Sequence, residues 1–219
     1  MKLHHLRLTG IGPFAGTVEI DLAALGASGM FLLEGPTGSG KSTILDAVVY
    51  ALYGQVAGSA TSADRIRSQF APPAEASVVD LIFETASGIH RVRRSPEYQR
   101  PKLRGTGTTK EQAKAVLWRI GSPQLIEDVI ADTAGGGSGL DVIATRIDEV
   151  GREIQRAVGL TREQFTQTVL LPQNEFARFL RAGTTERQAV LQRVFGTEIY
   201  DRVERQLEEM RKQARRQVD

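Results

Sequence analysis

A glycine-rich octapeptide constrains the fold of this 219-residue chain more than any other feature. Residues 35–42 read Gly-Pro-Thr-Gly-Ser-Gly-Lys-Ser and follow a nearly continuous apolar run at residues 29–34. Such a run is typical of a strand buried on both faces. After Lys41 the apolar residues take helical spacing up to Gly54, which suits a C-terminal cap. We therefore predict a strand, a glycine loop and a helix in that order, within an α/β fold.

The octapeptide matches the phosphate-binding loop pattern at every position. Glycines let successive backbone N–H groups turn inward around phosphate oxygens, and the following helix aims its positive end at the same anion. Lys41 suits the β- and γ-phosphates, and the Ser42 hydroxyl suits magnesium. Thr43 also fits an ordinary first helical turn. The expected nucleotide contacts are Gly35, Pro36, Thr37, Gly38, Ser39, Gly40, Lys41, Ser42 and Thr43.

Hydrolysis needs more than this cradle, since a carboxylate usually completes the magnesium site. A second nucleotide motif would be an apolar run that ends in Asp or Asp-Glu. Asp80 lies inside its apolar run, and Asp148-Glu149 follow polar residues. Residues 133–139 contain four glycines and only weakly mimic a signature motif, so we interpret them as a mobile loop. The sequence thus predicts half of an ATPase.

Alternating and helical patterns predict the remaining elements. Expected strands, paired as successive hairpins, lie at residues 3–8, 17–22, 77–84, 89–94, 115–120 and 125–130. A helix is expected from Ile143 to Val158, ended by Gly159. Thr161 with Gln164, and Thr185 with Gln188, predict capping boxes at two further helix starts.

The last segment, residues 198–219, alternates charges around a thin apolar seam. The seam residues are Val203, Leu207, Met210 and Ala214, at the spacing of a coiled coil. A solvated surface helix fits this short segment equally well. The sequence stops without a helix cap, from which we expect the packing partner to lie elsewhere.

Composition excludes several classes of protein. The chain has no cysteine, so disulfides, thiolate catalysis and cysteine-ligated metals are excluded. No signal peptide is evident, and the most apolar segment, residues 44–53, contains Asp46 and is about half of a membrane span. We expect a soluble, cytoplasmic protein without a membrane partner.

A local excess of basic residues stands out against the net charge of +2. Between residues 91 and 104 only Glu97 is acidic, and the basic residues are Arg91, Arg93, Arg94, Arg100, Lys102 and Arg104. This segment is our candidate for electrostatic DNA contact. A solvated hairpin explains it equally well.

Three blocks resemble the N-terminal half of the SbcC family, the bacterial double-strand-break repair ATPases related to SMC proteins and ABC ATPases. The blocks are residues 29–54, 159–180 and 186–200, the second containing Leu-Leu-Pro-Gln-Asn and the third Gly-Thr-Glu-Ile-Tyr. Residues 54–139 match that family only in their strand pattern.

This resemblance implies an ABC-ATPase-type P-loop NTPase lobe with an N-terminal antiparallel sheet and a helical lobe. Residues 1–197 would form the N-terminal part of the head, and residues 198–219 would start a coiled coil. ATP and magnesium are the implied cofactors. The implied partners are the C-terminal half of the same head, a second identical head, an SbcD-type metallophosphoesterase nuclease and double-stranded DNA.

In that family ATP-driven head dimerisation would control the partner nuclease at DNA ends and hairpins, and only the closed dimer would hydrolyse ATP. An SMC-like structural clamp without a nuclease is the alternative. A transporter ATPase domain is disfavoured because it has no use for a coiled-coil seam.

The resemblance also implies residue roles. Gln173 would be the Q-loop glutamine that ligates magnesium and senses the γ-phosphate, and it would act in catalysis together with Lys41. Arg65, Ile66 and Arg67 would lie near the adenine and ribose, although ordinary surface arginines fit as well. Some relatives carry Asn-Phe-Arg in the first turn, where this chain has Gly10-Ile-Gly12, so an arginine contact from that turn is not carried over.

Overall fold

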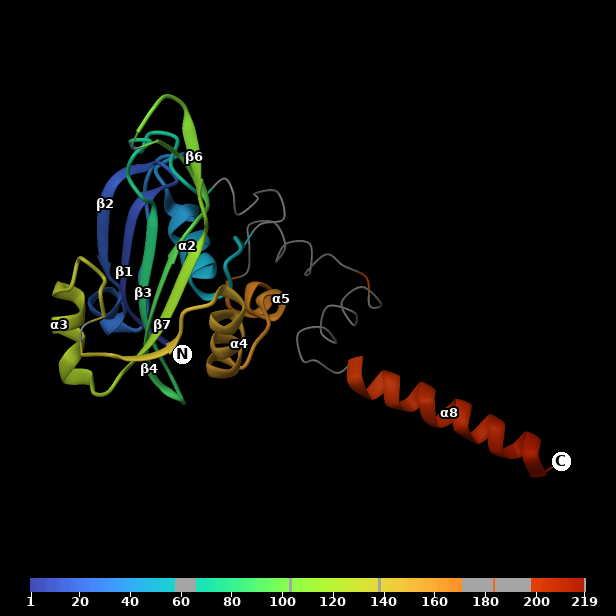
Figure 1. Ribbon diagram of the computed structural model, residues 1–219. Helices are drawn as coiled ribbons and strands as arrows, with labels where there is room; N and C mark the ends of the chain where they lie inside the picture. Colours follow the sequence, from blue (N-terminus) through green and yellow to red (C-terminus); the bar gives the residue numbers. More distant parts are fainter. Residues whose placement is uncertain (58–65, 103, 138, 171–182, 184–197, 219) are drawn as a thin grey trace. The chain divides into compact units, whose positions relative to one another are not determined.

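The structure, a computed structural model, describes residues 1–57, 66–102, 104–137, 139–170, 183 and 198–218 (Figure 1). The chain divides into two compact units, residues 1–160 and 161–219, which we describe one at a time. The predicted helix after Thr185 and the predicted Q-loop residue Gln173 lie outside the described residues.

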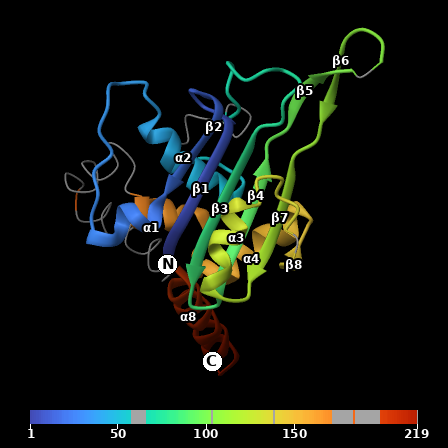
Figure 2. The same ribbon diagram turned by 90° about the vertical axis from the view of Figure 1, so that its left-hand side faces the viewer.

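The first unit is built on a six-stranded antiparallel sheet with strand order β2-β1-β3-β4-β7-β8 (Figure 2). Its strands are β1 (Lys2–Ile11), β2 (Phe14–Asp21), β3 (Val78–Thr85), β4 (Gly88–Ser95), β7 (Lys114–Ile120) and β8 (Asp141–Ala144). The predicted hairpins formed by β1 with β2 and by β3 with β4 are confirmed. A separate small hairpin, β5 (Tyr98–Pro101) with β6 (Thr108–Glu111), was not predicted. The short helix α1 (Leu22–Leu25) and the 3₁₀ turn η1 (Gly26–Ser28) follow β2.

One face of the sheet packs against two helices, α2 (Lys41–Tyr53) and α4 (Ile147–Val158) (Figure 1). The aligned residues Leu6, Leu81, Val92 and Leu117 lie on this face and are almost completely buried. Residues 47–52 of α2 are also buried. Gly54 and Gly159 end the two helices in left-handed conformations, as the sequence predicts.

The opposite face carries α3 (Ile126–Ala131), which follows the 3₁₀ turn η3 (Pro123–Leu125). Ile82, Ile89 and Ile120 of the sheet form a buried cluster with Val129 of α3. The prediction of a strand at residues 125–130 is therefore wrong. Pro123 and two acidic residues in the first turn favour a helix start here.

The strand that pairs with the free edge of β7 is β8. Ile143, which was expected to begin a helix, lies in this strand, and the helix α4 begins at Ile147. The apolar residues of β8 continue the helical spacing of α4 in sequence, so periodicity alone placed the boundary four residues early.

The apolar run at residues 29–34 does not form the predicted strand. It has no assigned strand structure, and Met30 and Leu32 are 84% and 83% exposed. A strand buried on both faces requires neighbouring strands and covering layers, and no described residues supply them to this run. The run thus carries apolar surface that the first unit leaves in solvent.

The second unit contains α5 (Arg162–Phe165), the π-helical turn η4 (Thr166–Leu170) and the long helix α8 (Glu198–Val218). The capping box of Thr161 and Gln164 is confirmed. Val203, Leu207 and Met210 are 49%, 59% and 58% exposed on α8. The predicted terminal helix is therefore present, with three residues of its apolar seam in solvent.

Candidate nucleotide-binding site

The glycine loop takes a conformation that requires glycine at two positions. Gly38 and Gly40 have φ angles of 86° and 97°, in the left-handed region. A Cβ at Gly40 would lie 2.5 Å from Cζ of Phe14, whereas a Cβ at Gly38 would meet nothing within 4 Å. The loop is thus packed against β2 on one side and open on the other.

The helix α2 begins directly after this loop without a side-chain cap. Gly40 is its N-cap residue, and no side chain accepts a hydrogen bond from the first turn. The N–H groups at a helix start need acceptors, and a phosphate oxygen satisfies them in many nucleotide sites. The geometry of this helix end therefore fits a phosphate group.

Lys41 lies over the loop. Its Nζ donates to the carbonyl oxygens of Gly35, at 2.6 Å, and Pro36, at 2.8 Å. The loop residues up to Ser39 are exposed, as is Ser42. The ammonium group and the Ser42 hydroxyl are therefore both within reach of a ligand that enters from solvent.

The turn between β1 and β2 covers the first turn of α2. Gly12 has a φ of 55°, and a Cβ there would lie 2.4 Å from Cγ2 of Thr43. Gly12 N donates to the carbonyl oxygen of Ile66 at 2.8 Å, and Ser68 N donates to that of Gly10 at 2.8 Å. This close approach leaves no room for a side chain at position 12, and it gives Thr43 a packing role.

The three residues predicted near the adenine, residues 65–67, differ in their positions and contacts. Arg65 lies outside the described residues, and Ile66 is buried beside the covering turn. The Arg67 guanidinium donates to Glu75 O, Ser77 Oγ and Pro72 O at 2.7–2.9 Å. It also lies 4.3 Å from the centre of the Tyr98 ring. The structure therefore gives this guanidinium a bracing role in its own loop.

The prediction that residues 91–104 form an exposed basic surface is wrong for two of the six basic residues. Arg91 and Arg94 are only 1% and 3% exposed. Arg91 pairs with Asp80 at 2.6 Å and Asp132 at 2.9 Å, and Arg94 donates to backbone carbonyls of α2. Both faces of β4 are covered at these two positions, so the two cations are buried instead of solvated.

The other four basic residues retain solvent access to different degrees. Arg93 lies 4.0 Å from Asp80, and Arg100 pairs with Glu111 at 3.1 Å. Lys102 and Arg104 are exposed near the tip of the β5–β6 hairpin, which extends beyond one end of the sheet (Figure 2). Within residues 91–104, the fully exposed positive charge thus lies near the tip of this hairpin.

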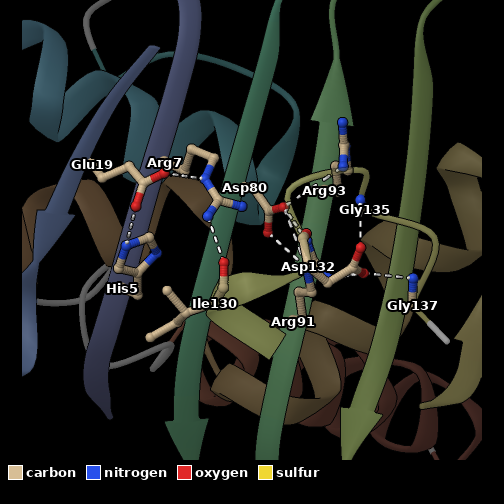
Figure 3. A network of polar contacts seen from close by, with 10 residues as sticks. All are labelled: His5, Arg7, Glu19, Asp80, Arg91, Arg93, Ile130, Asp132, Gly135 and Gly137. Atoms are coloured by element: carbon tan, nitrogen blue, oxygen red, sulfur yellow. Dashed lines mark hydrogen bonds and ion pairs between the residues drawn. The ribbon is translucent and has the colours of Figure 1, made fainter. Parts of the chain in front are cut away.

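A charged network crosses the α3 face of the sheet (Figure 3). Asp132 accepts from Arg91 and from the N–H groups of Gly135 and Gly137, both at 3.0 Å. The hydrogen bond from Gly137, followed by the pairing with Arg91, lowers the pKa of Asp132. These hydrogen bonds tie Gly135 and Gly137 to Asp132, and residues 133–137 contain neither helix nor strand, as the predicted loop requires.

The glycines of this loop have a steric purpose as well. A Cβ at Gly137 would lie 2.3 Å from Nε1 of Trp118. The sequence signal for this structure is an aspartate, Asp132, followed by glycines three and five positions later.

The network continues toward β2. Arg7 donates to Glu19 at 2.9 Å and to the carbonyl oxygen of Ile130 at 2.5 Å, and thereby ties α3 to β1 (Figure 3). The hydrogen bond from Arg7 lowers the pKa of Glu19. Burial, together with the nearby Arg7 charge, lowers the pKa of His5. This polar layer lies on the face of the sheet opposite α2 and is separate from the glycine loop.

The glycine loop, the uncapped helix start and the lysine above them define a lobe of the phosphate-binding-loop class. Comparison with known families agrees with this class. The chain belongs to the AAA domain family, whose model matches residues 5–219.

The sequence is also similar to proteins named as the SbcC subunit of the nuclease SbcCD. It is 36% identical to the Vibrio cholerae protein over 94% of this chain and 19% of that protein. It is 38% identical to the Lactococcus lactis protein, over 91% and 18%, and 31% identical to the Staphylococcus aureus protein, over 100% and 20%. The chain thus spans about a fifth of the length of these relatives, and the predicted resemblance to the SbcC family is confirmed.

Two kinds of feature are absent from the described part of the chain. No described helix combines the length and apolar character needed to cross a bilayer. No group of three or more described His, Cys, Asp or Glu side chains is placed to hold a metal ion.

Proposed function

We propose that residues 35–43 bind the phosphates of ATP with magnesium, within the N-terminal part of an ATPase head that serves a DNA-repair nuclease. The observation that carries this proposal is the uncapped start of α2 directly after a loop in which Gly38 and Gly40 are left-handed. Lys41 supplies the complementary positive charge at the same place.

The chemistry of binding follows from these groups. Lys41 would exchange the carbonyl oxygens of Gly35 and Pro36 for β- and γ-phosphate oxygens, which carry full negative charge. Ser42 would provide one oxygen ligand to magnesium, which prefers hard oxygen donors. We propose Gln173 as a second magnesium ligand and γ-phosphate sensor. Bound magnesium would neutralise charge on the phosphates.

The C-terminal half of the same head is the proposed partner of the apolar run at residues 29–34. Met30 and Leu32 are exposed directly before the loop, where a neighbouring strand would bury them. That half would also bring a carboxylate that completes the magnesium site. We assign residues 1–197 to the head and residues 198–219 to the start of a coiled coil, which the exposed seam of α8 supports.

A second copy of the head would complete each nucleotide site, so that ATP favours a closed dimer and hydrolysis releases it. The relatives are named as part of the nuclease SbcCD, which supports an SbcD-type nuclease as the partner that this cycle controls. Double-stranded DNA is the proposed substrate of the complex. Within the basic segment 91–104, the β5–β6 hairpin with exposed Lys102 and Arg104 is the proposed site of DNA contact.

Lys41→Ala tests the nucleotide site. Titration of the full chain with a fluorescent ATP analogue and magnesium should give saturable binding, which this variant should lose. Lys114→Ala removes an exposed lysine far along the sequence in β7 and should bind like the parent. Equal binding by Lys41→Ala and the parent would refute the site. Absence of a metallophosphoesterase from the purified complex would instead favour the structural clamp.

A further inference from the structure

The C-terminal end of α2 is buried, and its carbonyl oxygens must find donors within the protein. Tyr50, Ala51 and Leu52 are at most 4% exposed, so water cannot reach them. The carbonyl oxygen of Tyr50 accepts from Gly54 N at 2.8 Å. The next two accept from one side chain, since Arg94 Nε donates to Ala51 O at 2.7 Å and Nη2 to Leu52 O at 3.1 Å.

Arg94 reaches this helix end from β4, in the middle of the sheet. Among the described residues, no carboxylate lies within ion-pair distance of its guanidinium. The partial negative charge at the end of α2 is therefore its counter-charge. Burial lowers the pKa of Arg94 to about 10, which still leaves the side chain charged near neutral pH.

We propose that Arg94 is a positioning residue for the nucleotide site. By binding two successive carbonyl oxygens, it fixes the position and rotation of α2 against β4, and so places Gly40, Lys41 and Ser42 at the other end of the helix. This inference rests on the proposed nucleotide binding at residues 35–43 and adds a determinant of that site far from the phosphates.

The dimensions of α2 support this action at a distance. The helix has 13 residues and behaves as a rod about 20 Å long, so a shift at one end moves the other. Its first turn has no side-chain cap and is held by close contacts under Gly12 and Gly40. At both glycines the backbone and the neighbouring side chain are so close that no Cβ atom would fit between them. A displacement of the first turn of α2 would therefore produce a steric clash or open a gap.

Arginine is the side chain that suits this position. Its planar fork presents two donors in fixed directions, whereas lysine presents a single ammonium group on a flexible stem. The fork also fits closely beneath Gly54, where an added Cβ would lie 3.3 Å from Nη1. Lysine at position 94 would keep the charge but would not hold both carbonyl oxygens in one orientation.

Arg94→Met and Arg94→Lys test the proposal, with Arg91→Met as the matched control. Arg91 lies three residues away on the same strand, is equally buried, and points to the opposite face of the sheet, where it touches neither α2 nor the loop. Affinity for a fluorescent ATP analogue with magnesium is measured in the full chain at a temperature where each variant is folded. Urea unfolding of each variant is measured in parallel.

We expect Arg94→Met to weaken analogue binding by about tenfold, the factor that corresponds to loss of one or two buried hydrogen bonds that orient the site. Arg94→Lys should recover part of this loss. Arg91→Met should lower stability at least as much and leave the affinity unchanged. Should Arg94→Met prove too unstable to titrate, Arg94→Lys against Arg91→Met decides the question.

Two results would overturn the positioning role. One is parental affinity in the folded Arg94 variants, and the other is an equal loss of affinity in Arg91→Met, since binding would then follow overall stability. Failure of the underlying function looks different, because the parent would not bind the analogue or Lys41→Ala would bind it normally.

Discussion

Nη2 of Arg91 lies 2.6 Å from Oδ2 of Asp80, and both side chains are almost completely buried between the sheet and α3. A buried ion pair is costly to break from one side, because the remaining charge stays in a poorly solvated place. This pair therefore makes the α3 face sensitive to single substitutions.

Asp80→Ala should lower the free energy of unfolding by about 3–5 kcal/mol, as found when one partner of a buried pair is removed. Urea unfolding measures the loss. The double variant Asp80→Ala with Arg91→Met should be more stable than Asp80→Ala alone, since it removes a buried cation that would otherwise keep only the partly exposed Asp132 as a carboxylate partner among the described residues. A double variant that is less stable would show that the pair contributes little through its charges.

Gly12→Ala should lower stability by about 1–3 kcal/mol, because position 12 is left-handed and its Cβ would meet Thr43 at 2.4 Å. The same change should weaken binding of an ATP analogue, since Thr43 lies in the first turn of α2. Gly16→Ala is the matched control, with open space and no left-handed backbone. Adding Thr43→Ser, which removes Cγ2, should restore part of the lost affinity. No recovery would argue against the steric cause.

Met30→Ser with Leu32→Thr should change the stability of this chain by no more than about 0.5 kcal/mol, since both side chains are exposed here. The pair should nevertheless prevent association with the separately expressed C-terminal half of the head, measured by co-purification. Val142→Ser alters another exposed apolar side chain, in β8, and should leave association intact. Normal association of the Met30 and Leu32 variant would remove the proposed interface.

His90→Phe should change the pH dependence of stability. Burial, together with nearby Arg119, lowers the pKa of His90 below its ordinary value of 6.5, so the unfolded chain binds a proton more readily than the folded chain. Above pH 6.5 His90 is neutral in both states, and the stability of the folded chain is at its full value. As the pH falls from 6.5 toward the folded-state pKa, His90 is protonated more readily in the unfolded chain, and the free energy of unfolding decreases. The variant should show a flatter stability profile in that window.

At pH 7.5 the same variant should be no less stable than the parent. The Nδ1 atom of His90 has no hydrogen-bond partner among the described residues, and its ring stacks on Phe83 at 5.3 Å. Phenylalanine keeps the stacking and removes the unpaired nitrogen, a gain of about 1 kcal/mol. Urea unfolding at several pH values measures both effects, and an unchanged slope below pH 6.5 would contradict them.

Lys102→Glu with Arg104→Glu should weaken binding of duplex DNA by the complete protein complex and reduce its salt slope by about 2, one unit for each lost phosphate contact. Arg119→Glu with Arg146→Glu makes the same charge change at exposed positions away from the β5–β6 hairpin. This control should keep the parental slope. Equal effects of the two pairs would indicate a general charge effect.

Local signals predicted the parts of the fold that depend on neighbouring residues. The loop at residues 35–42, the helix after it, the capping box at Thr161 and the hairpin around Ser87-Gly88 all follow from short-range patterns. Residues 125–130 were misassigned because a short apolar run fits a strand and a helix equally well until its packing partner is known.

The glycine loop was recognisable in the sequence because its proposed chemistry is contained in eight consecutive residues, 35–42. The basic segment was not, because the fate of each arginine depends on partners distant in sequence. Asp132 lies 41 residues from Arg91, and Ala51 lies 43 residues from Arg94. The prediction of a strand at residues 29–34 is wrong for a related reason, since no described strand pairs with this run.

The two buried cations of β4 also have a consequence for how the sheet assembles. A shift of β4 by one residue against β3 would turn every side chain to the other face. Arg91 would then enter the apolar layer beneath α2 with no carboxylate, and Arg94 would leave the helix end that it serves. Pairing of β4 in the wrong register is thus destabilised on both faces of the sheet at once. The two buried charges therefore specify the register of β4 in addition to its hydrophobic residues.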